Sequence, residues 1–227
     1  MTDSAGTPPD AAAPRPGKRE RLVAAARELL HRQGIERTTL AEIAQAADVP
    51  PGNVYYYFKT KDDVIEAVVE ARVQETLAVM EALERRHRTP KGRLKALIAA
   101  SAQQGDSIAQ YGCPHGTLCS ELHKRATGPD PAVARLMRIP IEWAERQFRL
   151  MGRSDAAELA FDLIANYEGT ALLTHTFRDP QLLTREARRL ERWIDSLDAE
   201  SPDAAVVTAQ SRLPRLPQRT RRLQRSQ

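Results

Sequence analysis

We expect this 227-residue chain to fold entirely into α-helices. Three observations carry this expectation. Ala, Leu, Arg and Glu dominate the composition, and all four are strong helix formers. Glycine is sparse, with 11 residues, and aromatic residues make up only 5% of the chain. Apolar residues recur at spacings of three and four, which is the period of one helix face, from about residue 18 to residue 197.

Composition and charge exclude several classes of protein. Hydrophobic residues make up 41% and charged residues 28%, as in ordinary globular domains, and no apolar run approaches the roughly 20 residues that span a bilayer. The N-terminus lacks the apolar segment of a secretory signal, and two cysteines make no disulfide scaffold, so we expect a cytoplasmic protein. The net charge is only +4, but residues 212–227 contain six Arg and no acidic residue. Residues 1–61 carry a net charge of +2 and residues 62–211 a net charge of −4, and a basic N-terminal region on a mildly acidic body suits a polyanionic partner.

Two helices are expected at the start of the folded part. The first begins at about Lys18 and ends at Gly34, which suits a left-handed helix cap. Thr39 is followed three residues later by Glu42, and this spacing is typical of a capping box at the start of a short second helix.

A tight turn and two more helices follow. Asp48 tolerates the left-handed conformation that a turn requires. Pro51 is a good first residue for a third helix, which we expect to run to Phe58. A long fourth helix then begins at Thr60 or the next residue and continues to about Arg86.

Five more helices bring the expected total to about nine. The last of them has apolar residues spaced alternately by four and three between 183 and 197, a continuous seam typical of helix pairing. Residues 1–17 and 199–227 are rich in Pro and small or basic residues, and we expect a disordered arm and a disordered basic tail. The five helices are expected at 93–110, 117–125, 132–150, 156–177 and 181–197.

The second and third expected helices, with the turn between them, form a helix-turn-helix pattern. The third helix reads PPGNVYYYFKTK. Adjacent helical residues lie about 100° apart, so its three consecutive tyrosines cannot all face one core. Val54 and Phe58, four residues apart, are the better core pair. An exposed tyrosine beside lysines suits phosphates and base edges, and the sequence therefore favours contact with DNA over a buried aromatic cluster.

The stretch TTLAEIAQAADVPPGNVYYYFKTKDDVIEAVV resembles the N-terminal domain of TetR-family transcriptional regulators. It departs from the family at Asp48, where glycine is common. The resemblance implies an all-α homodimer with a helix-turn-helix DNA-binding domain at 18–61 and a ligand-binding and dimerisation domain at 62–198. It also implies that the last two helices, 156–177 and 181–197, pair across a two-fold axis as a four-helix bundle, which the seam at 183–197 fits.

The resemblance also assigns contacts with double-stranded DNA. Asn53 is the one side chain of the third helix suited to paired hydrogen bonds with adenine, so selectivity should lean on methyl contacts and DNA shape. A dimer requires a roughly palindromic operator. The expected phosphate contacts are Thr39, Tyr56, Lys61 and, more weakly, Lys59, and the residues expected at base edges or sugars are Pro51, Gly52, Asn53 and Tyr55.

A second segment, YGCPHGTLCSELHK at 111–124, resembles a YGCP-x-G-x-L-x-x-EL motif that one subgroup of these regulators carries near the ligand cavity. Two Cys and two His fall within 11 residues, and those at 119 and 123 share a helix face. Packing, a reactive thiol and a zinc site all remain open. The candidate ligand-binding residues are Tyr111, Cys113, His115, Cys119, His123, Trp143, Phe148 and Tyr167.

Three hypotheses follow for the function. The first is a repressor that a small organic effector releases from a palindromic operator. The second is a regulator of the same fold that responds to thiol chemistry or metal through Cys113 and Cys119. The third is a helical enzyme or partner-binding module without DNA binding. Catalysis by Cys and His needs an orienting third group, for which we find no motif, so we expect no enzymatic activity, cofactor or resident metal.

Overall fold

The computed structural model describes residues 16–125, 128 and 130–197, and within these residues the chain forms ten α-helices and no strand. The all-α prediction is confirmed. The expected disordered tail, and all but the last two residues of the expected arm, lie outside the described residues. In the described part of the chain, no helix combines the length and the apolar character needed to cross a membrane.

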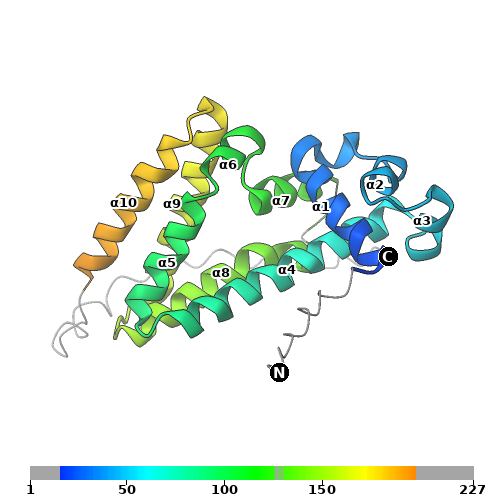
Figure 1. The fold of residues 1–227 in the computed structure, drawn as a ribbon. Coiled ribbons are helices and arrows are strands. Elements are labelled where there is room, and N and C mark those ends of the chain that lie inside the picture. The colour runs from blue at the N-terminus through cyan, green and yellow to red at the C-terminus, as the bar shows by residue number, and fades with distance from the viewer. Residues whose placement is uncertain (1–15, 126–127, 129, 198–227) are drawn as a thin grey trace, which may run out of the picture.

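Three helices form a compact head at one end of the molecule (Figure 1). Arg19 and its neighbours on the first helix cover a core in which Val54 and Phe58 are 1% and 3% exposed, so the predicted core pair is confirmed. Gly34 interrupts the first helix with a φ of 82° and a ψ of 171°, at the position where the sequence predicts that this helix ends. The head consists of α1 (Lys18–Arg37), α2 (Leu40–Ala46) and α3 (Pro51–Tyr57).

The long helix α4 (Lys61–Arg86) connects the head to the body, along which it lies beside α8 (Figure 1). The Thr60 hydroxyl accepts a hydrogen bond from the Asp63 backbone N–H, and the Asp63 carboxylate accepts one from the Thr60 N–H. This reciprocal cap explains why the helix begins where the sequence predicts.

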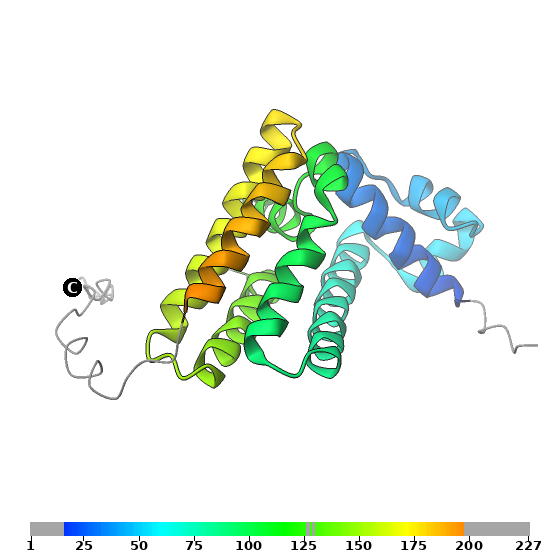
Figure 2. The same ribbon diagram turned by 60° about the vertical axis from the view of Figure 1, so that its left-hand side comes forward.

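Six helices complete the body. Figure 2 shows α10 against α5 and α9, and together with α4 and α8 these helices enclose a second core around Trp143, Phe148 and Ile194. The six are α5 (Pro90–Ala102), α6 (Gly105–Tyr111), α7 (Pro114–Arg125), α8 (Pro131–Leu150), α9 (Ala156–Phe177) and α10 (Gln181–Ser196).

Two expected helices of the body differ from the structure. The single helix expected at 93–110 is two helices, α5 and α6, which are separated at Gln103 and Gln104. The break brings Gly105 against Pro180, where an added Cβ would lie 3.2 Å from the proline carbonyl oxygen. Gly105 and Pro180 are far apart in the chain, so the local sequence pattern did not indicate this contact. Helix α7 begins at Pro114, three residues earlier than expected.

The seam at 183–197 lies inside the protomer. Leu183, Ala187, Leu190 and Ile194 are all at most 9% exposed in the single chain, because α10 packs on α5 and α9. The regular spacing of these apolar residues therefore reflects packing of α10 within one chain and not an exposed surface for a partner. Apolar side chains do remain exposed along the outer face of α9, at Phe161, Leu172, Leu173 and Phe177.

Candidate nucleic-acid interface and internal cavity

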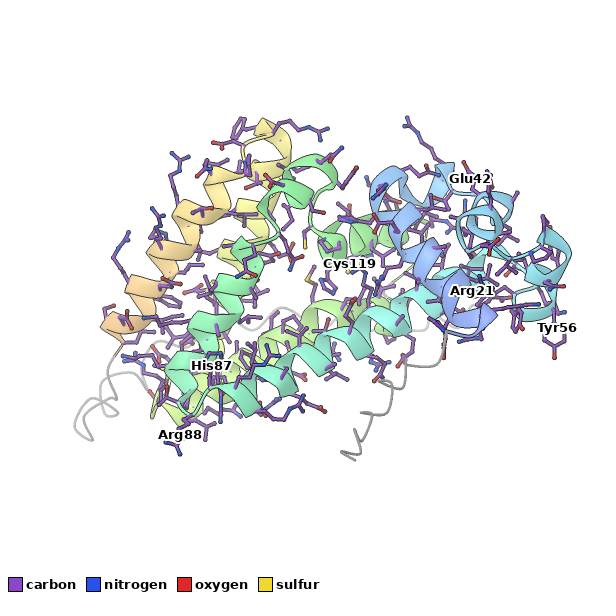
Figure 3. All side chains as sticks on the ribbon, viewed as in Figure 1. Arg21, Glu42, Tyr56, His87, Arg88 and Cys119 are labelled. Atoms are coloured by element: carbon purple, nitrogen blue, oxygen red, sulfur yellow. The ribbon has the colours of Figure 1, made fainter. Side chains whose placement is uncertain are left out.

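The turn between α2 and α3 is held by the first helix. Asp48 adopts a φ of 51°, the left-handed conformation that its side chain tolerates. One Nη of Arg21 donates to the carbonyl oxygens of Ala47 and Asp48, at 2.9 and 3.1 Å. Figure 3 shows Arg21 on α1, next to this turn. Arg21 is not among the residues predicted from the sequence, because an arginine on the polar face of an amphipathic helix carries no signal of its distant partner.

Helix α3 presents two of its three tyrosines to solvent. Tyr55 and Tyr56 are 56% and 77% exposed, whereas Tyr57 is half-buried against the head core. The Tyr56 side chain projects outward at the tip of the head (Figure 3). The prediction that the three rings cannot share one core is confirmed. Helix α3 therefore offers a rigid outer face with two hydroxyl groups and two aromatic rings.

The other residues expected at DNA surround this face. An added Cβ on Gly52 would meet no atom within 4 Å, so a duplex backbone can approach closely. The Lys59 ammonium donates to the Tyr55 carbonyl at 2.6 Å, which holds positive charge at the end of α3. Thr39, Pro51, Gly52, Tyr55, Tyr56 and Lys59 are exposed, and Asn53 and Lys61 are half-buried.

The Thr39 hydroxyl has a structural role at the start of α2. It donates to a Glu42 carboxylate oxygen at 2.8 Å and accepts from the Glu42 backbone N–H at 3.2 Å. Bonds from the Thr39 side chain and backbone N–H hold the pKa of Glu42 below its usual value. A phosphate at Thr39 would therefore share that residue with an ionised carboxylate.

A cavity of about 410 Å³ lies in the body, lined by side chains of α4, α5, α7, α8, α9 and α10. This size is typical of a small-molecule site. Most of its wall is apolar, with Leu136 and Leu163 among its residues. Its polar and charged groups include Arg72, Thr76, Ser101, His115, Tyr167, Glu75, Glu168 and Glu186. Only His115 and Tyr167 were among the eight residues predicted to bind a ligand.

The remaining predicted ligand residues lie away from the cavity wall. Trp143 is buried in the second core, where its indole N–H donates to Glu84 at 2.8 Å. Phe148 is fully buried and makes an edge contact with Trp193. His123 is exposed on α7. These side chains stabilise the body or face solvent, and their expected ligand contacts remain untested predictions.

The surroundings of both cysteines disfavour the thiolate form. Burial raises the pKa of Cys113 to about 12, and its thiol donates to a Glu168 carboxylate oxygen at 3.2 Å. Burial likewise raises the pKa of Cys119 to about 11, and that thiol lies 3.7 Å from the Val133 carbonyl oxygen. Figure 3 shows Cys119 on α7, between the head and the body. Among the described residues, no three His, Cys, Asp or Glu side chains are grouped to hold a metal ion.

Residues 111–121, which we name the bridge segment, connect the cavity with the head. The Tyr111 ring packs edge-on against His31 of α1, and the His31 ring nitrogen Nε2 donates to the Gly112 carbonyl at 2.9 Å. At the other end, the Glu121 carboxylate accepts a bond from the Ile35 N–H at 2.6 Å. Between these contacts, His115 lines the cavity. A change in the cavity wall can therefore reach α1 through one short segment.

Known proteins match this chain in sequence and in fold. Residues 22–68 match the sequence profile of "Bacterial regulatory proteins, tetR family". The transcriptional regulator TtgR of Pseudomonas putida is 22% identical over 188 residues, which cover 78% of this chain and 88% of that protein. The regulator BetI of Burkholderia thailandensis is 34% identical over 89 residues, and there the match covers 37% of this chain and 44% of BetI, less than half its length.

A solved structure extends the similarity to the whole described fold. The crystal structure of a TetR transcriptional regulator from Legionella pneumophila superposes with a TM-score of 0.69. The match covers 79% of this chain and 96% of the other, at 20% sequence identity. The arrangement of a helix-turn-helix head on a helical body is therefore one that bacterial regulators share.

Proposed function

We propose that this chain, a DNA-binding transcriptional regulator of the TetR type, acts in the cytoplasm as a homodimeric repressor that leaves a palindromic operator when a small organic molecule enters its cavity. The observation that carries this proposal is the exposed face of α3. Its two exposed tyrosines and the adjoining lysines lie on a helix-turn-helix, and Arg21 of α1 stabilises the turn of that motif by a hydrogen bond. Tyrosine hydroxyls and lysines bind phosphates, whereas the start of such a helix approaches base edges.

The outer face of α9 supports the proposed dimer. Phe161, Leu172, Leu173 and Phe177 are 48–66% exposed, and contiguous exposed apolar side chains on a single chain are typical of an interaction surface. Gly169 lies along the same helix and its added Cβ would meet nothing within 4 Å, so a partner helix can approach closely. Helix α10 contributes a mostly charged outer surface beside it, with its apolar seam turned inward.

Release from DNA requires that the effector favour one arrangement of the two heads over another. The cavity includes side chains of α4, which continues into the head, and of the bridge segment, which is bonded to α1. A ligand that displaces these walls changes the position of α1 relative to the body. Two α3 helices must lie about 34–36 Å apart to enter successive major grooves, so a change in spacing lowers operator affinity.

Substitution of Tyr55 by Ala tests the DNA-reading surface. The side chain is exposed, so the fold should persist, and loss of its contacts should weaken binding to the duplex upstream of the chain's own gene by roughly 5–100-fold. Fluorescence anisotropy measures the affinity, and sedimentation velocity checks that the oligomeric state is unchanged.

Tyr55→Phe is the matched control, because it keeps the ring and removes only the hydroxyl. If the Tyr55→Ala variant bound the duplex as tightly as the wild type, Tyr55 would not contribute to DNA binding. If the wild type showed no salt-sensitive binding to any duplex, the proposed repressor function would be wrong.

The thiol-responsive alternative has weaker support. A reactive thiol needs a lowered pKa and solvent access, whereas Cys113 is 5% exposed and has a raised pKa. The effector-responsive repressor accounts for both the cavity and the bridge segment, and we therefore prefer it.

A further inference from the structure

The charges on the cavity wall are unequal in sign. Four Arg and Glu side chains line it in the described part of the chain, and three of these are acidic. His115 adds no positive charge near neutral pH, because burial lowers its pKa to about 4. The wall therefore carries more negative than positive charge.

Two of the three carboxylates are already neutralised by arginines. Glu75 lies 3.3 Å from the Arg72 guanidinium and 2.8 Å from that of Arg27. Glu186 lies 2.6 Å from the Arg189 guanidinium. A cationic ligand gains less at either of these carboxylates than at an unpaired one, because an arginine already balances each charge.

Glu168 is the carboxylate for which the described residues supply no basic partner. The Cys113 thiol donates to one of its oxygens, Oε1, at 3.2 Å. The other oxygen lies against Gly116, where an added Cβ would approach it to 2.6 Å. Burial raises the pKa of Glu168 above its usual value, and the thiol only partly offsets that effect. The carboxylate is therefore held in place on the cavity wall without a compensating charge.

The surroundings of Glu168 suit a cation with an apolar body. Tyr167 also lines the cavity, and aromatic rings attract cations. Beyond it the wall consists largely of aliphatic side chains such as Leu136, Leu163 and Ile164. The volume of about 410 Å³ accommodates a medium-length alkyl chain or a few rings.

Building on the repressor function proposed above, we propose that the effector is an amphipathic organic cation, whose positively charged head contacts Glu168 and whose apolar body fills the remainder of the cavity. A cation supplies the charge that Glu168 lacks, and an uncharged or anionic molecule of the same shape does not. An organic anion would have to compete with Glu75 for Arg72. The cavity thus selects by charge at one end and by apolar volume elsewhere.

Three molecules with the same eight-carbon chain test this preference: octyltrimethylammonium, 1-octanol and octanoate. Isothermal titration calorimetry at pH 7.5, below the micelle concentrations, measures their affinities for the full chain without DNA. We expect the ammonium to bind about tenfold more tightly than the alcohol, because its charge attracts the Glu168 carboxylate and desolvation of the two charges offsets only part of that attraction, and we expect octanoate to bind most weakly.

Glu168→Gln should lower the affinity for the ammonium to about that for the alcohol and leave the alcohol unchanged. Glu81→Gln is the matched control, because Glu81 lies exposed on α4 outside the cavity and its loss changes the net charge equally. It should keep the tenfold preference. Thermal unfolding should show Glu168→Gln at least as stable as the wild type, since a buried amide costs less than a buried carboxylate.

A preference for octanoate, equal affinities for all three molecules, binding of none of them, or an unchanged preference in Glu168→Gln would overturn the proposal. Operator binding by the ligand-free protein is measured separately. If the protein binds the operator but shows no charge preference, only the proposal of a cationic effector is wrong. If it shows the charge preference but does not bind the operator, the proposed repressor function is wrong.

Discussion

Cys113 illustrates how burial alters the chemistry of one side chain. The sequence places it in a Cys- and His-rich segment, which left reactive thiol, metal and packing roles open. In the structure its nearest ionisable partner is Glu168, 55 residues further along the chain. A neighbouring carboxylate and a buried site both disfavour the thiolate, so proximity in sequence to two histidines does not activate this cysteine.

We therefore predict that Cys113 reacts slowly with thiol reagents in the folded protein. At pH 8 a thiol with a pKa of about 12 is almost entirely protonated, and it is 5% exposed. Ellman's reagent should label it at least about 100-fold more slowly in buffer than in denaturant. The same assay should show Cys119, which is half-buried, reacting faster. Rapid labelling of Cys113 under native conditions would restore the thiol-sensor hypothesis.

His115 predicts how stability depends on pH. Its folded pKa of about 4 lies below the usual value of 6.5, because burial and the nearby Arg72 disfavour the charged form. The unfolded chain therefore binds a proton that the folded chain does not. The stability is present above pH 6.5 and is lost as the pH falls toward 4, by about 2 kcal/mol between pH 7.5 and 5.0.

Urea unfolding of the wild type and of His115→Gln at pH 7.5 and 5.0 measures this contribution by difference. The variant should lose less stability than the wild type on acidification. The comparison is necessary because Glu168 has a raised pKa and so acts in the opposite direction, gaining stability as the pH falls. Equal losses in both proteins would show that His115 titrates normally.

At the scale of helices, features that depend on residues close together in the chain could be predicted from the sequence, whereas features that depend on contacts between distant residues could not. The caps at Thr39 and Thr60 depend on residues three apart, so the starts of α2 and α4 could be read directly. The break between α5 and α6 depends on contact between Gly105 and Pro180, which no window of the sequence contains. The cavity wall likewise combines six helices. For that reason Arg72 and Glu168 were missed, although the aromatic and Cys-rich positions were singled out.

The bridge segment yields a prediction for coupling between body and head. Glu121 accepts the Ile35 N–H just after the interruption of α1 at Gly34, and a Glu121→Ala variant removes that acceptor. Its loss should cost about 1–3 kcal/mol of unfolding free energy, the usual penalty for an unsatisfied buried donor. Under the proposed mechanism it should also reduce the effect of ligand on operator affinity.

Glu121→Gln is the matched control, because the glutamine side chain keeps an acceptor oxygen while losing the charge. Chemical denaturation gives the stability, and anisotropy with and without octyltrimethylammonium gives the coupling. Unchanged coupling in Glu121→Ala would mean that the signal reaches the head through α4 or through the contacts of His31 with the bridge segment. Reduced coupling in Glu121→Ala, restored in Glu121→Gln, would assign transmission to the bond at Ile35.

At the scale of the whole molecule, the predicted dimer needs a surface that the single chain leaves open. The seam of α10 is used within the protomer, so the apolar area must come mainly from α9. Leu172, 66% exposed, lies in the C-terminal part of α9, next to Leu173 and five residues before Phe177. Replacement by Glu would place a charge between two copies and leave the fold of each copy intact, because the side chain makes no part of the described cores.

Leu172→Glu should therefore sediment as a monomer at concentrations where the wild type is a dimer. A monomer engages one half-site, so operator affinity should fall by about 100-fold or more through lost avidity. Leu150→Glu is the control, since Leu150 is 65% exposed at the end of α8 and carries the same change in charge and size. It should remain dimeric with normal affinity. A dimeric Leu172→Glu with full operator affinity would place the two-fold axis on another surface, and the spacing of the two α3 helices would then have to be derived again from that surface.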